Sequence, residues 1–282
     1  MLNNMSHWQD YRISVNNLNL FDLSARYDNL TRLALQYNPE LVAIFIDIRL
    51  KNIVIASYHG YDQPNREFID EINRQFVNPV LVFEYGNLPN TNEQHNLNAI
   101  SRFLAKRNET NENVIVTSGH CYQFEPDYFL KLWVSLNVHN YIGKMSRISL
   151  HHMCDFGIVS IEDNVEPRRS IRNTDSSKYQ EIYIDSKNDT KNNHLGIHSC
   201  KSGYFTHLTC GYLRSNKAIY PYKISYVINI ENHIYDIGGP VLTYIDINHI
   251  YLSGILTSGI GNIGFVTNID SILMRRGLLL EL

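Results

Sequence analysis

Three segments of the sequence carry the residue types that acyl-transfer chemistry needs, and they follow one another along the chain. His120 comes directly after the apolar run VIVTS, and Asp155 opens the apolar run DFGIVSI. A histidine can take a proton, a carboxylate can orient that histidine, and a glycine turn can present backbone N–H groups to an oxyanion. The turn at 235–240, YDIGGP, has the glycines but carries Ile237 in front of them. Since isoleucine has no atom that can attack a carbonyl carbon, the pattern predicts a site without a nucleophile.

The elements that must position these residues are short strands. Beyond residue 95, β-branched and apolar runs alternate with turn residues, as in VIVTS, FGIVSI, SYVINI, PVLTY, YLSGIL and GFVTN. One helix is expected at Ile269–Arg276, with Asn268 as its cap and Gly277 as its stop. The polar stretch Glu162–Asn193 is expected to be a long surface excursion, in which EIYI could form a strand. This half of the chain is therefore predicted to be mainly β.

The first third of the chain has a different texture. Helical spacing of apolar residues over Leu23–Tyr37, then two apolar runs, a second helical stretch up to Phe76 and the run PVLVFEY predict the order helix, hairpin, helix, strand. The segment GNLPNTNE lacks periodicity and is the best linker candidate. We therefore expect an N-terminal tail at 1–19, a small α+β domain at 20–86, a linker at 87–94 and a β domain at 95–282.

Five ordered motifs resemble one protein family. TSGHC, DFGIV, CKSGYFTHLTCG, the D-x-GGP of Asp236–Pro240 and GILTSG are similar to motifs of the chymotrypsin-like serine proteases, in the streptogrisin and α-lytic branch. The resemblance covers roughly Ala99 to the C-terminus. It implies two packed antiparallel β-barrels, preceded here by a domain whose element order resembles the pro-region of α-lytic-type proteases.

The resemblance also implies roles for single residues. His120 corresponds to the general base and Asp155 to its orienting carboxylate. Tyr235 and Ile237 occupy the oxyanion-hole positions, with Ile237 in place of serine and Tyr235 in place of glycine. Ser258 and Gly259 correspond to the edge that pairs with substrate backbone. Loss of the nucleophile alone removes on the order of a millionfold in turnover. The bulky side chain of Tyr235 is expected to disturb the hole further, so restoring serine alone would be insufficient.

The chain has four cysteines. The resemblance implies a disulfide between Cys200 and Cys210, whereas the usual partner of Cys121 is replaced by Ala99. Cys121 and Cys154 are therefore expected to be buried thiols, because neighbouring side chains on a strand point to opposite faces. The H-H-x-C cluster of 151–154 would be splayed apart by the same alternation, so no metal and no cofactor are expected.

The charge balance and the chain start bear on partners and compartment. The formal net charge is −3 with scattered charges, which argues against nucleic acid as a partner, and no apolar run is long enough for a membrane span. The start MLNNMSHWQD lacks the pattern of a secretory signal, although the resemblance implies an extracellular protein. Expected partners are a peptide or protein in the cleft and the chain's own domain 20–86, whose final strand could extend a sheet edge of the β domain.

The leading hypothesis for function is a proteolytically inactive relative of the serine endopeptidases that keeps a binding cleft. One alternative is an active secreted endopeptidase, which requires position 237 to be a sequence error. Another is an interaction protein that uses the barrel surface and not the cleft. Reaction with serine-directed reagents and competition by extended peptides separate these hypotheses.

Overall fold

The computed structural model describes residues 20–47, 49–76, 81–86, 103–123, 127–131, 139–151, 154–163, 165, 168–173, 175–188, 195–220 and 223–280. The predicted tail at 1–19 and the predicted linker at 87–94 lie outside these residues. None of the helices in the described part of the chain has both the length and the apolar character needed to cross a bilayer.

The N-terminal elements follow the predicted order. They are α1 (Leu20–Tyr37), β1 (Ala43–Asp47), β2 (Asn52–Tyr58), α2 (Arg66–Gln75) and β3 (Leu81–Gly86). The apolar face of α1 is buried with α2 against the hairpin, in a cluster that includes Leu23, Leu30, Ile44, Ile55 and Ile72. β1 and β2 pair antiparallel, and β3 adds to β2 in parallel after the α2 crossover. The helical periodicity and the continuous apolar runs therefore form the elements they predict.

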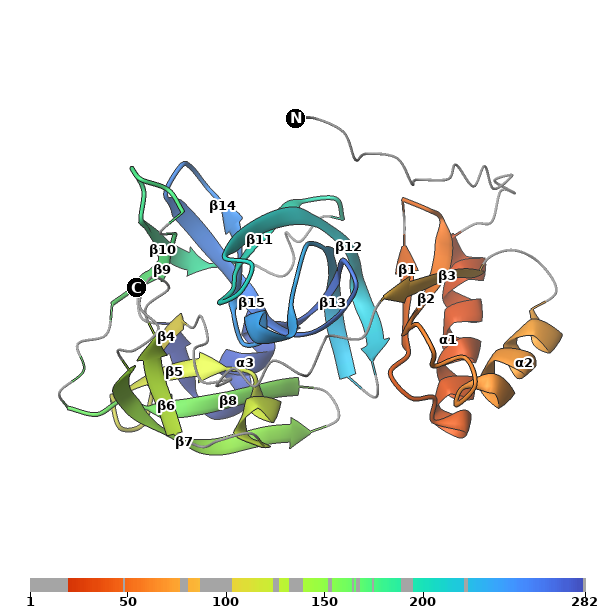
Figure 1. Ribbon diagram of the computed structural model, residues 1–282, viewed down its shortest axis with the longest axis horizontal. Coiled ribbons are helices and arrows are strands. Elements are labelled where there is room, and N and C mark those ends of the chain that lie inside the picture. Colours follow the sequence, from red (N-terminus) through yellow and green to blue (C-terminus); the bar gives the residue numbers. More distant parts are fainter. Residues whose placement is uncertain are drawn as a thin grey trace.

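Strand β1 joins this small domain to the rest of the protein. It pairs antiparallel with β12 (Leu208–Tyr220) through Ile44 and Ile219, and Figure 1 shows the two strands side by side. The prediction that the final strand of the domain makes this junction is wrong. The parallel β2–α2–β3 crossover places β3 on the far side of β2, and the opposite edge of this small sheet, β1, pairs with β12.

An apolar cluster fills the junction behind the paired strands. Phe45 and Val54 of the hairpin pack with Val227, Ile260 and Phe265 of the β domain. Beside this cluster, Arg214 of β12 contacts the carboxylates of Asp47 (2.7 Å) and Glu84 (2.6 and 2.9 Å). Burial acts to lower the pKa of Arg214, but the hydrogen bonds and charges of the two carboxylates outweigh it and raise that pKa.

The first sheet of the β domain carries one half of the candidate site. Its elements are β4 (Phe103–Arg107), β5 (Asn113–Thr117), η1 (Gly119–Gln123), β6 (Asp127–Lys131), β7 (His139–His151) and β8 (Cys154–Ser160). Within the described residues the sheet runs in the order β17-β4-β5-β8-β7-β6. The C-terminal strand β17 (Leu278–Leu280) completes it by pairing with β4.

The second barrel carries the other half of the site. Its strands are β11 (His198–Ser202), β12, β13 (Lys223–Asn229), β14 (Pro240–Tyr244), β15 (His249–Ile260) and β16 (Ile263–Asn268). They pair in the order β11-β14-β15-β16-β13-β12, and β12 pairs back to β11, which closes the barrel. The short helix η3 (Ile234–Asp236) lies between β13 and β14.

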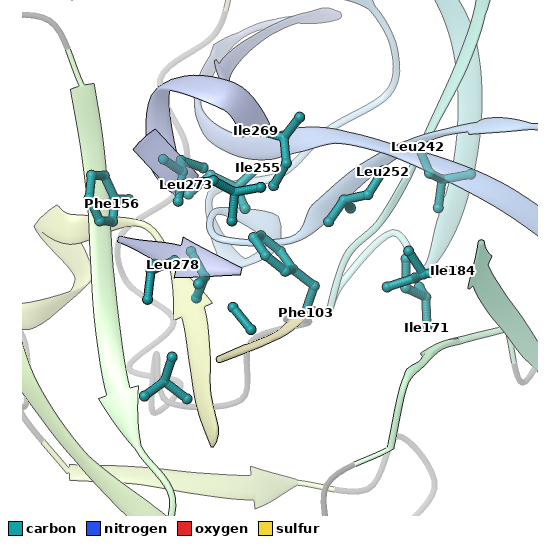
Figure 2. Close-up of a cluster of buried hydrophobic side chains, with 14 of the residues drawn as sticks. Phe103, Phe156, Ile171, Ile184, Leu242, Leu252, Ile255, Ile269, Leu273 and Leu278 are labelled. Atoms are coloured by element: carbon teal, nitrogen blue, oxygen red, sulfur yellow. The ribbon is translucent and has the colours of Figure 1, made fainter. Parts of the chain in front are cut away.

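One core lies between the two sheets. Figure 2 shows Phe103 of β4 among Ile255, Leu252 and Ile269, with Phe156 and Leu278 beside them. The helix α3 (Ile269–Arg276) closes this core, and its bounds and caps are as predicted: the Asn268 side chain accepts a hydrogen bond from the helix start, and Gly277 ends it in the left-handed region. The structure is mainly β, as predicted, with two strand assemblies around a shared interior.

The polar stretch Glu162–Asn193 contains more regular structure than a surface excursion. Within its described part, β9 (Ser170–Arg172) and β10 (Glu181–Lys187) form an antiparallel pair. β10 contains the EIYI run and pairs in parallel with β15. Ile182 and Ile184 of that run are buried in the core, which explains why an otherwise polar segment forms a strand.

Candidate functional site

Asp155 lies at the start of β8, completely covered by the segment that leads into η1. Ser118 Oγ donates a hydrogen bond to Asp155 Oδ2 at 2.8 Å, and both residues are buried. Gly119 presses directly on the same carboxylate, since a Cβ atom there would lie 2.8 Å from Asp155 Oδ1 and 2.7 Å from the Phe156 carbonyl oxygen. Only a glycine allows this approach. His120 follows in η1, and its side chain lies outside the described part of the structure.

Ile237 projects toward the element that carries His120. Its side chain packs against the cluster of Cys121, Met145 and Val159, and Cys121 is the neighbour of His120 in η1. The fold therefore brings the η1 segment, Asp155 and position 237 into one region from two different sheets. At position 237, the predicted nucleophile position, a branched hydrocarbon makes apolar contacts.

The backbone at 236–239 is a tight turn set by glycine. Ile237 has φ −59° and ψ 135°, Gly238 has φ +89°, and Gly239 N donates to the Asp236 carbonyl at 3.0 Å. This is the geometry of a type II turn, whose third position requires a positive φ and so favours glycine. Position 237 is the second residue of this turn. The turn explains Gly238, whereas Gly239 is explained by its close approach to β11, since a Cβ there would lie 2.4 Å from the Ser202 carbonyl oxygen.

Both predicted oxyanion-hole positions, Tyr235 and Ile237, have their N–H groups engaged within the same segment. Ile237 N donates to the Ile234 carbonyl oxygen at 3.3 Å, which closes the single turn of η3. Tyr235 N lies 3.4 Å from His233 Nδ1, which accepts from it. Because these bonds point the donors back into the chain, neither N–H group is directed at an external oxygen in this conformation.

Asp236 anchors this turn to the neighbouring β11–β12 hairpin. Its carboxylate accepts hydrogen bonds from Lys201 Nζ, the backbone N–H groups of Phe205, Thr206 and His233, and the Thr206 hydroxyl, at 2.7 to 3.0 Å. The side chains of Lys201 and Asp236 are both 0% exposed. Burial lowers the pKa of Lys201, and the charge of Asp236 partly offsets that effect. Lys201 thus supplies a cation for Asp236 from within the chain.

An aromatic stack covers the outer side of η3. The Phe205 and His233 rings are stacked with centroids 4.0 Å apart, and the Tyr235 ring is tilted 5.0 Å from His233. The ring contacts hold His233 where its Nδ1 meets the backbone of η3. Tyr235 therefore acts on the predicted oxyanion hole in two ways besides the size of its side chain: through its backbone N–H group, and through the stacking of its ring.

The predicted substrate edge lies in β15 and is in contact with the N-terminal domain. Ser258 and Gly259 are partly buried, and the Tyr58 hydroxyl of β2 donates to the Gly259 carbonyl oxygen. Burial, with a smaller contribution from Tyr61, raises the pKa of Tyr58, which keeps this hydroxyl a donor. Gly86 at the end of β3 packs on the turn that follows β15, since a Cβ at position 86 would lie 2.5 Å from Gly261 N.

The cysteines are arranged as predicted. Cys200 and Cys210 are joined in a disulfide between directly opposed positions of β11 and β12. Cys121 and Cys154 are buried thiols in two separate apolar clusters. Of the H-H-x-C cluster, His152 lies outside the described residues.

Solved structures with the same arrangement of strands are proteases. A Nocardiopsis protease matches with 19% identity over 65% of this chain and 93% of its own, at a TM-score of 0.50. The chain has the fold of a chymotrypsin-like serine protease. Thermobifida fusca protease A (19% identity, 63% and 88% coverage, TM-score 0.49) and Cellulomonas bogoriensis chymotrypsin (17%, 65% and 97%, 0.46) also match. No protein-family model and no curated protein matches the sequence.

Identities this low support the chymotrypsin-like fold and not the roles of single residues, so the assignments of His120 and Asp155 stay predictions. Three hydrogen bonds of the site were not predicted from the sequence. Lys201 donates to Asp236, the Tyr235 N–H group donates to His233, and the Tyr58 hydroxyl donates to the Gly259 carbonyl. The first two lie inside or near predicted motifs. The third joins residues 201 positions apart, and no local pattern in the sequence indicates it.

Proposed function

We propose that this chymotrypsin-fold protein is proteolytically inactive and acts by binding, with its own N-terminal domain held on the edge of the cleft. The observation that carries the proposal is the turn at 234–237. It has a hydrocarbon at the nucleophile position and both neighbouring N–H groups bonded inside the chain.

Two independent obstacles to peptide cleavage support the inactive state. Ile237 has neither a proton to transfer to a base nor an atom to attack a carbonyl, so no acyl-enzyme can form. The closed η3 turn would in addition leave a tetrahedral oxyanion without its donors, and the loss of one such donor costs about 3 to 4 kcal/mol in activation free energy. A serine placed at 237 would therefore still face a closed hole.

Tyrosine at position 235 supports the closed turn. Its φ is not positive, and a non-glycine residue avoids the left-handed region. Its N–H donates to His233, and its ring belongs to the stack with Phe205. A glycine at 235 would remove the ring and allow the backbone a wider range of φ and ψ. The double change at 235 and 237 is therefore the smallest set of substitutions that we expect to restore catalysis.

The contact between Tyr58 and Gly259 supports a binding role for the cleft edge. The Gly259 carbonyl, which an extended peptide would use as an acceptor, is already engaged by the N-terminal domain. We therefore propose that residues 20–86 are the resident ligand of this edge. A foreign peptide would have to displace the Tyr58 hydroxyl before it could pair there.

The test is an activity assay on the protein as encoded, Ile237→Ser and the double variant Ile237→Ser/Tyr235→Gly, each treated with a serine-directed phosphonate and a mixed peptide substrate library. Ile247→Ser, a change at an isoleucine that is 63% exposed, is the matched control. Neither the parent nor the control should react, and the double variant should react faster than Ile237→Ser. A covalent adduct on the parent protein would refute inactivity. Equal rates for the single and double variants would refute the role of the closed turn.

A further inference from the structure

Three side chains with metal-binding atoms meet on the β11–β12 hairpin where the core borders solvent: His198 and Cys210 are exposed, and Cys200 is buried in the core. His198 and Cys200 are two residues apart on β11, so both point to the same face of the strand. Cys210 lies directly opposite Cys200 on β12. The ligand atoms of the three residues all lie within 4.8 Å of one another, and His198 Nδ1 is 4.0 Å from Cys200 Sγ.

The distance between His198 Nδ1 and Cys200 Sγ is close to that in a tetrahedral zinc site, whereas the two sulfur atoms, joined in the disulfide, have to separate on reduction. Bond lengths of about 2.3 Å for Zn–S and about 2.0 Å for Zn–N place a sulfur and a nitrogen ligand roughly 3.5 Å apart. His198 and Cys200 need to approach by only about 0.5 Å to reach that separation. Since His198 and Cys210 are exposed and Cys200 is buried, an ion would enter from solvent and keep a water molecule as its fourth ligand.

We propose that, when the Cys200–Cys210 disulfide is reduced, His198, Cys200 and Cys210 form a binding site for Zn²⁺. Reduction breaks the S–S bond, and a dithiol supplies two electrons and two protons as it closes to its own disulfide. Zinc then displaces the two thiol protons to solvent and binds two thiolates and the neutral imidazole. The disulfide and the metal are alternative crosslinks between the same two strands.

Replacement of the disulfide by zinc would affect the candidate site, because the β11–β12 hairpin holds the 234–237 segment. The turn between the two strands supplies the backbone N–H groups of Phe205 and Thr206 to Asp236. Either crosslink holds the strand ends that carry this turn. A zinc ion would therefore maintain the anchor of the 234–237 segment under conditions that open the disulfide.

The test is a titration with Co²⁺ as a spectroscopic probe for Zn²⁺. The full chain is reduced with dithiothreitol, desalted without oxygen and titrated beside an oxidised sample of the same protein. The reduced chain should bind one Co²⁺ with thiolate charge-transfer absorption and the visible bands of tetrahedral cobalt, and Zn²⁺ should displace it. The oxidised chain should show neither absorption.

Variants assign the ligands without disturbing the folded, oxidised protein. His198→Ala should weaken Co²⁺ binding at least about tenfold, and His207→Ala, on the turn of the same hairpin, should leave it unchanged. The pair Cys121→Ala/Cys154→Ala should keep the full signal, because Cys121 lies in a different cluster and Cys154, although it shares the core with Cys200, is not among the three residues whose ligand atoms meet. No thiolate band in the reduced chain, an unchanged affinity in His198→Ala, or loss of the band in the Cys121/Cys154 variant would each overturn the proposal.

Discussion

Replacement of Lys201 by methionine tests whether a buried ion pair holds the closed turn. Methionine fills a similar volume but leaves the Asp236 carboxylate without its cation. Breaking a buried pair by removing one partner costs about 3 to 5 kcal/mol. Here the carboxylate keeps four of its five hydrogen-bond donors, since only the Lys201 ammonium is lost. We therefore expect the lower end of that range, about 3 kcal/mol of unfolding free energy.

The reciprocal change should cost more. Asp236→Asn removes the charge that faces the Lys201 ammonium, which then keeps only the Thr206 hydroxyl as a partner. An uncompensated buried ammonium places this variant at the upper end of the range, about 5 kcal/mol. The double variant Lys201→Met/Asp236→Asn should lose less unfolding free energy than the two single variants lose together, because neither charge is left without its partner.

The measurement is the free energy of unfolding from urea denaturation followed by circular dichroism at 25 °C. Lys217→Met, which disrupts an exposed pair with Asp28 at 4.0 Å, is the control and should cost less than about 1 kcal/mol. A loss below about 1 kcal/mol for Lys201→Met, or strictly additive losses in the double variant, would mean that the two groups are not a buried pair in solution.

Three further changes probe other contacts. The hydrogen bond that His249 Nδ1 donates to the Asp185 carboxylate raises the pKa of His249, so Asp185→Asn should lower that pKa toward its ordinary value in an NMR titration. Because the folded pKa is the higher one, the pair's contribution to stability is full below the ordinary pKa and is lost as pH rises through the raised value. Arg214→Met should cost about 3 to 5 kcal/mol and speed hydrogen exchange in β1, whereas the exposed Arg168→Met should do neither. Tyr58→Phe should cost about 1 kcal/mol and strengthen binding of an extended fluorescent peptide by anisotropy; unchanged affinity would contradict the occupied edge.

Local patterns were sufficient to predict most of the individual elements. The helix at Ile269–Arg276 was predicted to the residue, because its cap and its stop are both encoded by side-chain type. The order of the N-terminal elements followed from apolar periodicity in the same way. The junction through β1 was not predictable in this way, because both β1 and β3 are edges of the small sheet, and pairing between Ile44 and Ile219 depends on which of them meets β12 in the folded chain.

Some features of the candidate site can also be read from the sequence, and others require the structure. The type of residue at 237 and the crowding at 235 are properties of the sequence itself. The closed η3 turn is made by the carbonyl of Ile234 and the imidazole of His233 within the same segment, but the motif does not show this conformation, and Lys201 reaches Asp236 across 35 positions. The meeting of His198 with Cys210 likewise requires the strand register of β11 and β12. Sequence motifs thus led to the prediction that the site lacks a nucleophile, and the structure shows the contacts that residues 233–237 make.

The sheet continues from the second barrel into residues 20–86, so cleavage of the chain between these two parts would not by itself separate them. Strand pairing at β1, the apolar junction and the Arg214 contacts all lie outside the stretch between Gly86 and Phe103. A protease that nicked the backbone in that stretch would produce two bands on a denaturing gel. The fragments would still migrate together in native size-exclusion chromatography, so processing and departure of the N-terminal piece are separate events that need separate measurements.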